Sequence, residues 1–587
     1  ALARTPGVER VEANVVVHAT MDAARADFGV DRARADFGLT GAGVEACVLD
    51  TGVDPNHEQL DSKTIVFRDF VGSATDPYDD HGHGTHVASI LLGDGTGGSN
   101  ASKYGGVAPG ASLVAGKVLD ANGSGATDDI AAAIGWCADR PSVDIISMSL
   151  GSIFGSDGTD ALSQAVNAAV ADGKVAVVAA GNAGDAPYGV GSPGAASGAI
   201  TVGAAADWSA APGTPNHSDG VSLAYFSSRG PTMDDRTKPD VVAPGVTITA
   251  AEQGTAAGYV TYSGTSMATP FAAGAIALAL QAQPGWTPAQ VRSAVEGTAR
   301  DRGVQGKDDD WGAGLLDVYA LAAQAEGTSG ETTFPAHTHV SASVPNDGLW
   351  THQFALGSGD LTVPIAATIL VDGRCIFFFP GFGCLDENWS PDLDARLIDP
   401  TGLVLDESTC ALGNECGIGR QETLHAMPTV AGTYTIQVYP FADSPNDGLG
   451  GSFEFDLSRG PVGSEPPPPP PPPPPPATIH VGDLDGVSVQ VTTKRWESRV
   501  TIKAHDESET PLAGVLVRAR WNASSTTVSC TTNTNGTCRI TKRWATSRAR
   551  VTFTVVSLAA SGMAYAAADN HDPDADSDGT VISVSRP

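Results

Sequence analysis

Short apolar runs alternate with alanine-rich helical patterns over roughly residues 40–330. Each run is apolar almost throughout, whereas a strand with one face in water would alternate apolar and polar residues. Such strands are buried on both faces, which requires helices on both sides of a sheet. The pattern predicts an α/β domain with a mostly parallel central sheet. The runs are Val44–Leu49, Leu113–Leu119, Asp144–Met148 and Val175–Ala180, and two of the helical patterns are Asp128–Ala138 and Gly158–Asp172.

After about residue 328 the apolar residues follow a period of two instead. Tyr434, Ile436 and Val438 would share one face of a strand, a pattern typical of an antiparallel sandwich, and similar alternation recurs after residue 478. Eleven consecutive prolines lie between the two regions, at 466–476. They predict an extended polyproline II spacer, which we favour over a ligand for partner domains. We therefore expect two small all-β sandwich domains after the α/β domain.

The chain is strongly acidic, with a formal net charge of −33 at pH 7. Nucleic acid and anionic membrane surfaces are poor partners for such a chain, so we expect neither. No apolar stretch is expected to reach the ~18–20 residues of a membrane span. The first ten residues lack the basic start and apolar run of a signal peptide, so an exported form would already have lost its signal.

Six of the eight cysteines fall in three close pairs, Cys375/Cys384, Cys410/Cys416 and Cys530/Cys538. Close pairs in β-rich segments indicate disulfides and an oxidising compartment, and no C-x-x-C spacing favours a metal instead. The dipeptide Asn535-Gly536 predicts a tight hairpin that places the last pair opposite each other. Cys47 and Cys137 are equally compatible with a disulfide and with two buried thiols.

An aspartate, a histidine and a serine each stand at the end of a predicted strand or the start of a predicted helix. Asp50 ends the first strand, His83 lies in a glycine-rich stretch before a helix, and Ser266 opens a long alanine-rich helix. Open α/β sheets place their sites at the carboxyl ends of the strands. A serine becomes a nucleophile when an imidazole takes its proton, and a carboxylate holds that imidazole in the required tautomer. The three residues together predict amide hydrolysis.

Each segment alone has a simpler explanation. Asp50-Thr51-Gly52 could be a turn, and Gly264-Thr265-Ser266 is typical of a helix cap. The histidines of His81–His86 could share a metal ion, although no further ligand set is evident. Their joint occurrence favours catalysis.

The segments DTGVD (50–54), HGTHVA (83–88) and GTSMATP (264–270) resemble the three signature motifs of the subtilisin-like serine protease family. The resemblance covers about residues 40–325 and keeps the family order of aspartate, histidine and serine. It implies that Ser266 is the nucleophile, His83 the general base and Asp50 the anion that orients it. His81 and His86 would then have structural roles, and no cofactor is required for the chemistry.

The resemblance extends to the substrate site. Asn182 matches the asparagine that donates to the oxyanion together with the Ser266 N–H. Gly191 matches the floor of the primary specificity pocket. Backbone that would hold the substrate as an added strand matches Gly123, Ser124, Gly125, Ser149, Leu150 and Gly151, with Gly181 beside them.

The composition of these segments also predicts specificity. Ala183 and the glycines provide no charge near the pocket, so we expect broad specificity with an apolar preference for the residue before the scissile bond. Thr127 is small and predicts loose selectivity at the next position.

Structural calcium is implied only in part. Gln59 stands where the family supplies a calcium-binding aspartate, which argues against the strong family site. Asp240 matches a residue of a weaker cation site and is the candidate metal ligand. The run Asp574-x-Asp576-x-Asp578-Gly579 imitates a calcium loop, but Ser585 replaces the bidentate glutamate, so weak calcium binding and an acidic turn are equally compatible.

The flanks resemble other modules. Residues 1–20 resemble the end of the family's inhibitory propeptide, with an ordinary N-terminal arm as the alternative. The expected division is a propeptide remnant at 1–20, a subtilisin-like peptidase domain at 21–328, a pre-peptidase C-terminal-like β-sandwich at 329–462, a polyproline linker at 463–477 and an immunoglobulin-like β-sandwich at 478–587.

We therefore expect a secreted, monomeric serine endopeptidase that acts on protein or peptide substrates, with sandwiches that bind an extracellular surface or polymer. The rival from another class is an adhesive protein in which the peptidase fold only displays the sandwiches. The complete set of Asp50, His83, Ser266 and Asn182 favours the enzyme.

Overall fold

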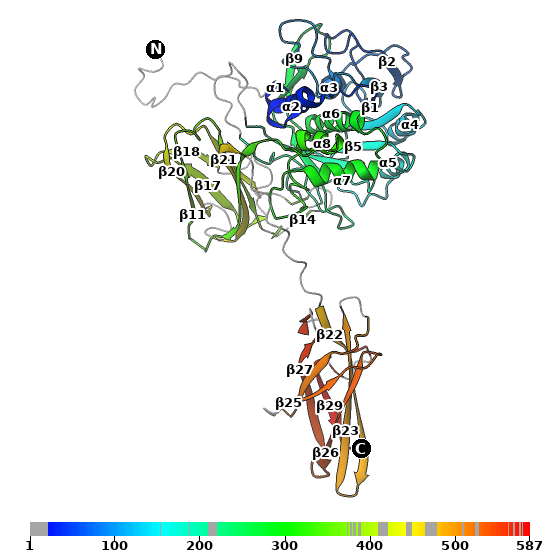
Figure 1. The fold of residues 1–587 in the computed structure, drawn as a ribbon, viewed down its shortest axis with the longest axis vertical. Coiled ribbons are helices and arrows are strands. Elements are labelled where there is room, and N and C mark those ends of the chain that lie inside the picture. The colour runs from blue at the N-terminus through cyan, green and yellow to red at the C-terminus, as the bar shows by residue number, and fades with distance from the viewer. Residues whose placement is uncertain are drawn as a thin grey trace. The chain divides into compact units, whose positions relative to one another are not determined.

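The computed structural model describes residues 21–587 except 153, 187, 209–219, 373, 376–377, 380–382, 385–388, 409–420, 442–448, 464–477, 507–509, 523–526, 561–562, 568–569, 574–576 and 578. By its contacts the chain divides into two compact units, residues 1–468 and 469–587 (Figure 1). The predicted propeptide remnant and nearly all of the predicted polyproline linker lie outside the described residues.

The first unit is built on a sheet of seven parallel strands. In chain order these are β1 (Glu45–Asp50), β2 (Ile65–Asp69), β3 (Ser112–Lys117), β4 (Val143–Met148), β5 (Val175–Ala179), β6 (Ile200–Ala205) and β7 (Val241–Pro244). Across the sheet their order is β2-β3-β1-β4-β5-β6-β7, and every neighbouring pair is parallel. All residues of β5, β6 and β7 are buried, as helices on both faces require. The predicted α/β class is confirmed.

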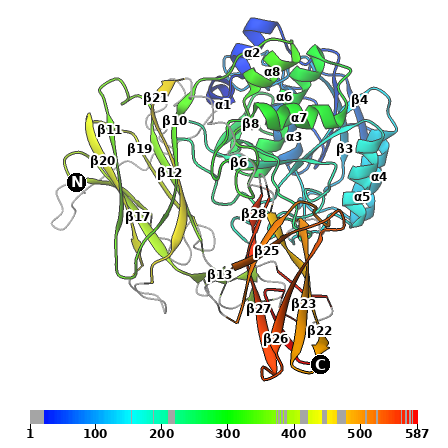
Figure 2. The ribbon, with the colours of Figure 1, turned by 60° about the horizontal axis from the view of Figure 1, so that its bottom comes forward.

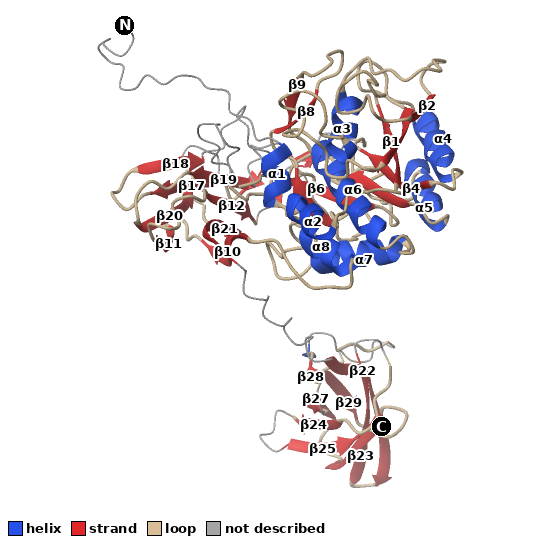
Figure 3. Ribbon diagram, turned by 45° about the horizontal axis from the view of Figure 1, so that its top comes forward, coloured by secondary structure: helices blue, strands red, loops and turns tan. Residues whose placement is uncertain are grey.

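Helices cover both faces of this sheet (Figure 3). On one face, α4 (Thr127–Ala138) and α5 (Ala161–Ala171) share a core with β1, β3, β4 and β5. On the other face, α3 (His83–Leu92) and α6 (Thr265–Ala282) belong to a larger core. That core also includes α1 (Met21–Asp27), α2 (Val30–Phe37), α7 (Pro288–Thr298) and α8 (Val318–Ala325), and β8 (Ile248–Ala251) pairs with β9 (Tyr259–Tyr262) beside it.

Helix α6 corrects one expectation from the sequence. Among the described residues it is the one helix long and apolar enough to cross a membrane, by length and composition. However, 83% of its 18-residue window is buried inside the molecule, where it packs against α3 and the sheet. Its apolar composition is therefore explained by its place at the centre of the core.

The first unit also contains an antiparallel sandwich. One sheet has the order β10-β21-β12-β19 and the other β11-β20-β17-β18, and the two share one core that includes Tyr434, Ile436 and Val438. The strands are β10 (Phe334–Ser343), β11 (Trp350–Leu356), β12 (Ile365–Val371), β17 (Leu393–Ile398), β18 (Val404–Ser408), β19 (Gln421–Ala426), β20 (Gly432–Pro440) and β21 (Ser452–Gly463). Two short pairs are added, β13 (Arg374–Cys375) with β16 (Trp389–Ser390) and β14 (Phe378–Phe379) with β15 (Gly383–Cys384).

This sandwich packs directly against the α/β domain. Gln421 Nε2 donates to Leu223 O at 2.7 Å, and the Leu223 N–H donates to Thr368 Oγ1 at 3.1 Å. At a separate point the Gly303 N–H donates to Asp456 Oδ1 at 3.0 Å. Buried polar contacts of this kind explain why the two parts form one compact unit.

The second unit is a sandwich of two four-stranded sheets, β26-β23-β22-β28 and β25-β24-β27-β29 (Figure 2). Its core holds Trp496, Val500, Trp521 and Phe553. The strands are β22 (Thr478–Thr492), β23 (Arg495–Asp506), β24 (Leu516–Trp521), β25 (Thr527–Thr531), β26 (Thr537–Ala545), β27 (Arg550–Ala559), β28 (Ala564–Tyr565) and β29 (Val581–Ser585). All pairings are antiparallel except that of β22 with β28.

Two disulfides form among the described residues. Cys47 on β1 is bonded to Cys137 on α4, which decides between the two alternatives for these residues. Cys530 is bonded to Cys538, joining β25 to β26. The tight turn at Asn535-Gly536 and the predicted pairing of the two cysteines are confirmed. The two strands nevertheless belong to different sheets, because β25 pairs with β24 and β26 with β23, so the predicted hairpin of paired strands is wrong. The other two predicted pairs, Cys375/Cys384 and Cys410/Cys416, lie outside the residues whose side chains are described.

Candidate active site

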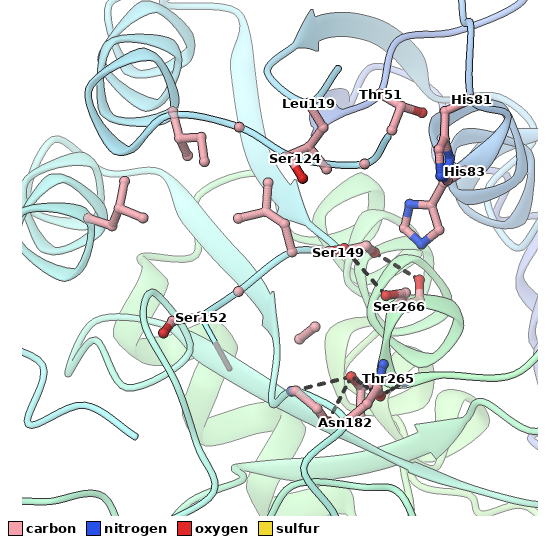
Figure 4. A pocket seen from close by; sticks show the side chains of 18 of the residues that line it. Thr51, His81, His83, Leu119, Ser124, Ser149, Ser152, Asn182, Thr265 and Ser266 are labelled. Carbon is pink, nitrogen blue, oxygen red and sulfur yellow. Dashed lines mark hydrogen bonds between the residues drawn. The ribbon is translucent and has the colours of Figure 1, made fainter. Parts of the chain in front are cut away.

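Three elements bring the aspartate, the histidine and the serine together. Asp50 is the last residue of β1, in the interior of the sheet. His83 is the first residue of α3, and Ser266 is the second residue of α6. The end of β1 and the starts of α3 and α6 meet at the carboxyl edge of the sheet, where open α/β sheets place their sites. Figure 4 shows His83 projecting toward the Ser266 side chain.

Asp50 holds the imidazole of His83. His83 Nδ1 lies 2.7 Å from Asp50 Oδ1, and the same oxygen accepts the Thr51 N–H at 2.7 Å. The side chains of His83 and Asp50 are 20% and 1% exposed. Burial disfavours the charged imidazole, but the Asp50 carboxylate outweighs burial and raises the pKa of His83 above its usual value. With the Nδ1 proton donated to Asp50, Nε2 is the atom that can accept a proton.

Ser266 lies in the first turn of α6 and is tied to Ser149 in both directions. Ser266 Oγ donates to Ser149 O at 3.3 Å, and Ser149 Oγ donates to Ser266 O at 2.8 Å. Between the described side chains of Ser266 and His83 no hydrogen bond forms, and in proteases without substrate this bond is often long. The first-turn N–H groups of a helix lack intrahelical partners, so the Ser266 N–H is available to an oxyanion.

Asn182 follows β5 and lies beside Thr265, close to Ser266 (Figure 4). Its Oδ1 accepts the Thr265 N–H at 3.0 Å and the Thr265 hydroxyl at 2.9 Å. These two bonds fix which way the amide is turned. They leave the Nδ2 hydrogens to face a developing negative charge.

A cavity of about 760 Å³ runs past His83 and Ser266. The predicted substrate-contacting residues that line it are Gly123, Ser124, Gly125, Ser149, Leu150, Gly151, Gly181 and Asn182. Thr127 and Ala183 line it as well. Its described lining contains no aspartate, glutamate, lysine or arginine, and it includes Leu119, Ile130 and Leu162.

Two predicted site residues lie away from this lining. Gly191 is buried and contacts Ser152, which lines the cavity, and a Cβ at Gly191 would lie only 2.1 Å from Ser152 O. The carboxylate of Asp240 is 1% exposed and pairs with the ammonium groups of Lys238 and, at 2.6 Å, Lys307. Two ammonium groups already neutralise this carboxylate, which argues against a metal ligand here, and cation binding by Asp240 stays a prediction.

The side chain of Gln59 is not available as a calcium ligand. Gln59 is fully buried, and its Nε2 donates to Ala101 O at 2.8 Å and to the Tyr259 hydroxyl at 2.9 Å. Its Oε1 accepts the Gly95 N–H at 3.0 Å. Calcium needs six to eight oxygen ligands. The oxygen and the nitrogen of the Gln59 amide instead form hydrogen bonds that link loops. Most of the calcium-like run at 574–579 lies outside the described residues.

The other histidines of the glycine-rich stretch lie on either side of His83. His81 lines the cavity, while His86 is buried and donates its Nε2–H to Val260 O at 3.1 Å. Burial, together with the nearby His83, lowers the pKa of His86 to about 3, so this ring stays neutral. The contacts of His86 are those of a packed structural residue.

Asp79 is a site residue that the sequence reasoning missed. Its carboxylate is 5% exposed and accepts five hydrogen bonds. The donors are the hydroxyls of Thr51 and Thr85 and the N–H groups of His81, Gly82 and Thr85. Asp79 therefore fixes the start of α3, which carries His83, against the strand end that carries Asp50. The only available signal was the pair Asp79-Asp80 before the glycine-rich stretch, and it does not show which of the two is buried.

Lys117, at the end of β3, was missed as well. It is 1% exposed, and its Nζ donates to Thr51 O at 2.7 Å and to Leu119 O at 2.9 Å. A single lysine inside an otherwise apolar run was the signal, because a buried ammonium must find acceptors. Lys117 holds the residue after Asp50 in place.

A second cavity, also about 760 Å³, begins at Asn182. The α/β domain contributes Tyr225, Phe226, Thr247 and Ser263 to its walls, among others. The first sandwich contributes Ser408, Gln421, Thr423 and His425. Asn182 lines both cavities.

Comparison with known proteins agrees with this geometry. A family model described as the subtilase family matches residues 41–314. Serine protease AprX of Bacillus subtilis (strain 168) is 39% identical over 343 residues, which is 54% of this chain and 75% of that protein. Subtilisin E of the same organism is 39% identical over 328 residues, 55% of this chain and 77% of that protein. A solved structure titled Sphericase has 34% identity and a TM-score of 0.41, and covers 50% of this chain and 98% of that one.

Proposed function

Because the chain belongs to the subtilase family and is a serine endopeptidase, we propose that it is secreted and cuts proteins broadly, with a preference for apolar residues before the scissile bond. The observation that carries the proposal is the His83–Asp50 pair beside Ser266, in a cavity whose described lining holds no aspartate, glutamate, lysine or arginine. The disulfide between Cys47 and Cys137 supports an oxidising, extracellular location.

The proposed reaction uses four side chains. Ser266 Oγ attacks the carbonyl carbon of the substrate while His83 Nε2 takes the hydroxyl proton, and Asp50 stays ionised to stabilise the imidazolium. The resulting oxyanion accepts hydrogen bonds from Asn182 Nδ2 and the Ser266 N–H. His83 then gives the proton to the leaving amine, and the acyl group remains on Ser266. A water molecule, deprotonated by His83, releases the acid and restores the hydroxyl.

The specificity follows from the lining of the first cavity. The backbone segments Gly123–Gly125 and Ser149–Gly151 provide strand-like partners for an extended peptide, which gives affinity without side-chain selection. Leu119, Ile130 and Leu162 add apolar surface, and burial of an apolar substrate side chain against it contributes about 25 cal/mol per Å². A charged substrate side chain would find no described counter-charge there.

Digestion of denatured casein tests this proposal. We expect the purified chain to release peptides whose cleaved bonds mostly follow apolar residues, because the described lining of the cavity holds no acidic residue, lysine or arginine. An organic sulfonyl fluoride should abolish cleavage and add its mass to the peptide that contains Ser266, as mass spectrometry would show. Absence of cleavage, or labelling at another serine, would rule out the proposed site, and cleavage mainly after charged residues would rule out the specificity.

We also propose that the first sandwich binds the part of the substrate that follows the scissile bond. The backbone segments Gly123–Gly125 and Ser149–Gly151 line the first cavity, and Asn182 lines both the first cavity and the second. A peptide that passes the oxyanion residue therefore enters a space whose wall includes Thr423 and His425 of the sandwich. The docking of the sandwich by Gln421 holds that wall in position.

Replacing His425 by alanine should affect only substrates that reach the second cavity. For a peptide with four residues after the scissile bond we expect KM to rise about 2- to 10-fold, the loss of one modest polar contact. A short substrate with a chromogenic amide as leaving group should keep its kcat/KM within about twofold. Gln353→Ala, an exposed change on the other sheet of the sandwich, is the matched control. Equal effects on the two substrates, or no effect on either, would exclude this role.

The proposed division of the chain keeps a propeptide remnant at 1–20, a peptidase domain at 21–328, a first sandwich at 329–462, a linker at 463–477 and an immunoglobulin-like sandwich at 478–587. The compact unit that ends at residue 468 supports a boundary inside the proline run. Binding of an extracellular polymer remains the proposed task of the last sandwich, and the monomeric state is proposed with it.

A further inference from the structure

Three histidines meet inside the second unit, far along the chain from the residues of the peptidase site. They are His480 on β22, His505 on β23 and His571 in the loop between β28 and β29. One ring nitrogen of each lies within 4.8 Å of one from each of the others. Among the described residues this is the one group of three or more histidine, cysteine or acidic side chains close enough to hold a metal ion.

The sheet places the first two histidines side by side. His480 and His505 are direct partners in the antiparallel register of β22 and β23. Their neighbours Val481 and Ala504 face the core of the sandwich, so both histidines face away from it. They are nevertheless only 2% and 7% exposed, because the segment that carries His571 lies over them.

The third histidine is fixed by backbone contacts. The His571 N–H donates to Val481 O at 2.9 Å, and Asn570 Oδ1 accepts the Val481 N–H at 2.8 Å. Asn570 Nδ2 donates in turn to the Tyr565 hydroxyl at 2.7 Å and to Thr580 Oγ1 at 2.9 Å. His571 is therefore held at the edge of β22, with its ring centroid 5.2 Å from that of His480.

A glycine makes room for the arrangement. A Cβ on Gly482 would lie 2.1 Å from His505 Nδ1, so any side chain there would push this ring out of the group. An apolar residue would fill such a buried position at lower cost than an imidazole, whose polar nitrogens lose water on burial. Two buried imidazoles and one half-buried imidazole around one point, with a glycine that admits one of them, are the arrangement that a transition metal needs.

We infer that His480, His505 and His571 bind one divalent transition-metal ion such as zinc, which ties the loop after β28 to β22 and β23. Zinc binds imidazole nitrogen at about 2.0–2.1 Å, so the three nitrogens would move closer together when the ion binds. Three protein ligands leave a fourth tetrahedral position for water. The ion would clamp the end of the sandwich at which β22 begins.

Cobalt(II) and zinc(II) titrations of the full chain test this site. The chain carries no affinity tag and has Ser266→Ala to prevent self-digestion. We expect one Co²⁺ per chain with the visible absorption of a tetrahedral site, displaced by one equivalent of Zn²⁺. His571→Ala and His505→Ala should each weaken binding by about 100-fold or more, since even changes outside the ligand shell cost 10- to 100-fold. His425→Ala, which removes an exposed histidine of the first sandwich, should bind as the parent does.

A second measurement avoids any dependence on the folding of the variants. Zinc X-ray absorption of the loaded parent chain should show three imidazole nitrogens at about 2.0 Å. Absence of stoichiometric binding by the parent would overturn the proposal. So would variants that are folded by circular dichroism and bind as tightly as the parent, or a zinc spectrum with fewer than three imidazoles.

Discussion

Ser266→Ala is expected to lower kcat for a peptide substrate by about 10⁴- to 10⁶-fold, the loss that follows removal of the nucleophile of a serine protease triad. The acyl-enzyme cannot form without Oγ, so only binding and the oxyanion donors remain to accelerate attack by water. KM should change little, because the strand-binding segments and the apolar lining are untouched. Steady-state kinetics on a chromogenic peptide gives both quantities.

We expect no neighbouring hydroxyl to replace Ser266 Oγ as the nucleophile. The hydroxyl of Ser149, which contacts Ser266, already donates to Ser266 O at 2.8 Å. Ser142→Ala is the matched control, since Ser142 is exposed and precedes β4 at the amino edge of the sheet, opposite the site. It should keep kcat within about twofold. Activity of Ser266→Ala above one hundredth of the parent value would mean that another residue is the nucleophile.

The α/β core is the part of the fold that the sequence predicts well. The run Val44–Leu49 corresponds to β1 at Glu45–Asp50, and Val175–Ala180 to β5 at Val175–Ala179. Burial on both faces removes polar residues from these strands, so their limits are visible in the sequence alone. The same logic fails for α3, which was predicted to begin after the glycine-rich stretch but begins within it at His83, because Asp79 stabilises the glycine-rich first turn from outside.

Contacts between residues that lie far apart in the sequence could not be predicted, because no local sequence pattern indicates them. The docking of the first sandwich depends on Gln421 and Asp456, two polar residues on strands whose alternation predicts only which face is apolar. The chain passes from one sheet to the other between β25 and β26, because each of these strands pairs with a different neighbour. A turn motif in the sequence does not encode that pairing. For the same reason Asp50, His83 and Ser266 were recognised from motifs, whereas Asp79 became visible only through its five donors.

Asp79→Ala is expected to lower the free energy of unfolding by about 3–5 kcal/mol, because several buried donors would lose their acceptor at once. Activity should fall as well. The carboxylate links Thr51, next to Asp50, to the first turn of the helix that carries His83, and a displacement near 1 Å in a catalytic group can cost about 100-fold in rate. Urea unfolding and kcat, measured on the same preparation, check both effects.

The isosteric variant Asp79→Asn separates charge from packing. One oxygen can still accept from Thr51, His81 and Gly82, while the amide nitrogen would face the Thr85 N–H, so we expect a smaller loss than for alanine. Hydrogen bonds hold the pKa of Asp79 below its usual value against the opposing effect of burial. The charge therefore adds stability above the unfolded pKa of about 3.9, and this is lost as pH falls through the lower folded value. The gap between parent and Asp79→Asn should accordingly be largest near neutral pH and shrink in acid.

Asp76→Asn provides the matched control, since Asp76 is an exposed carboxylate in the same loop. It should change neither the free energy of unfolding nor kcat beyond experimental error, because a solvated carboxylate loses no buried partner. If Asp79→Ala unfolded at the urea concentration of this control and kept its kcat, the start of α3 would be held by the packing of the helix alone. The five hydrogen bonds would then have no part in positioning His83 against Asp50.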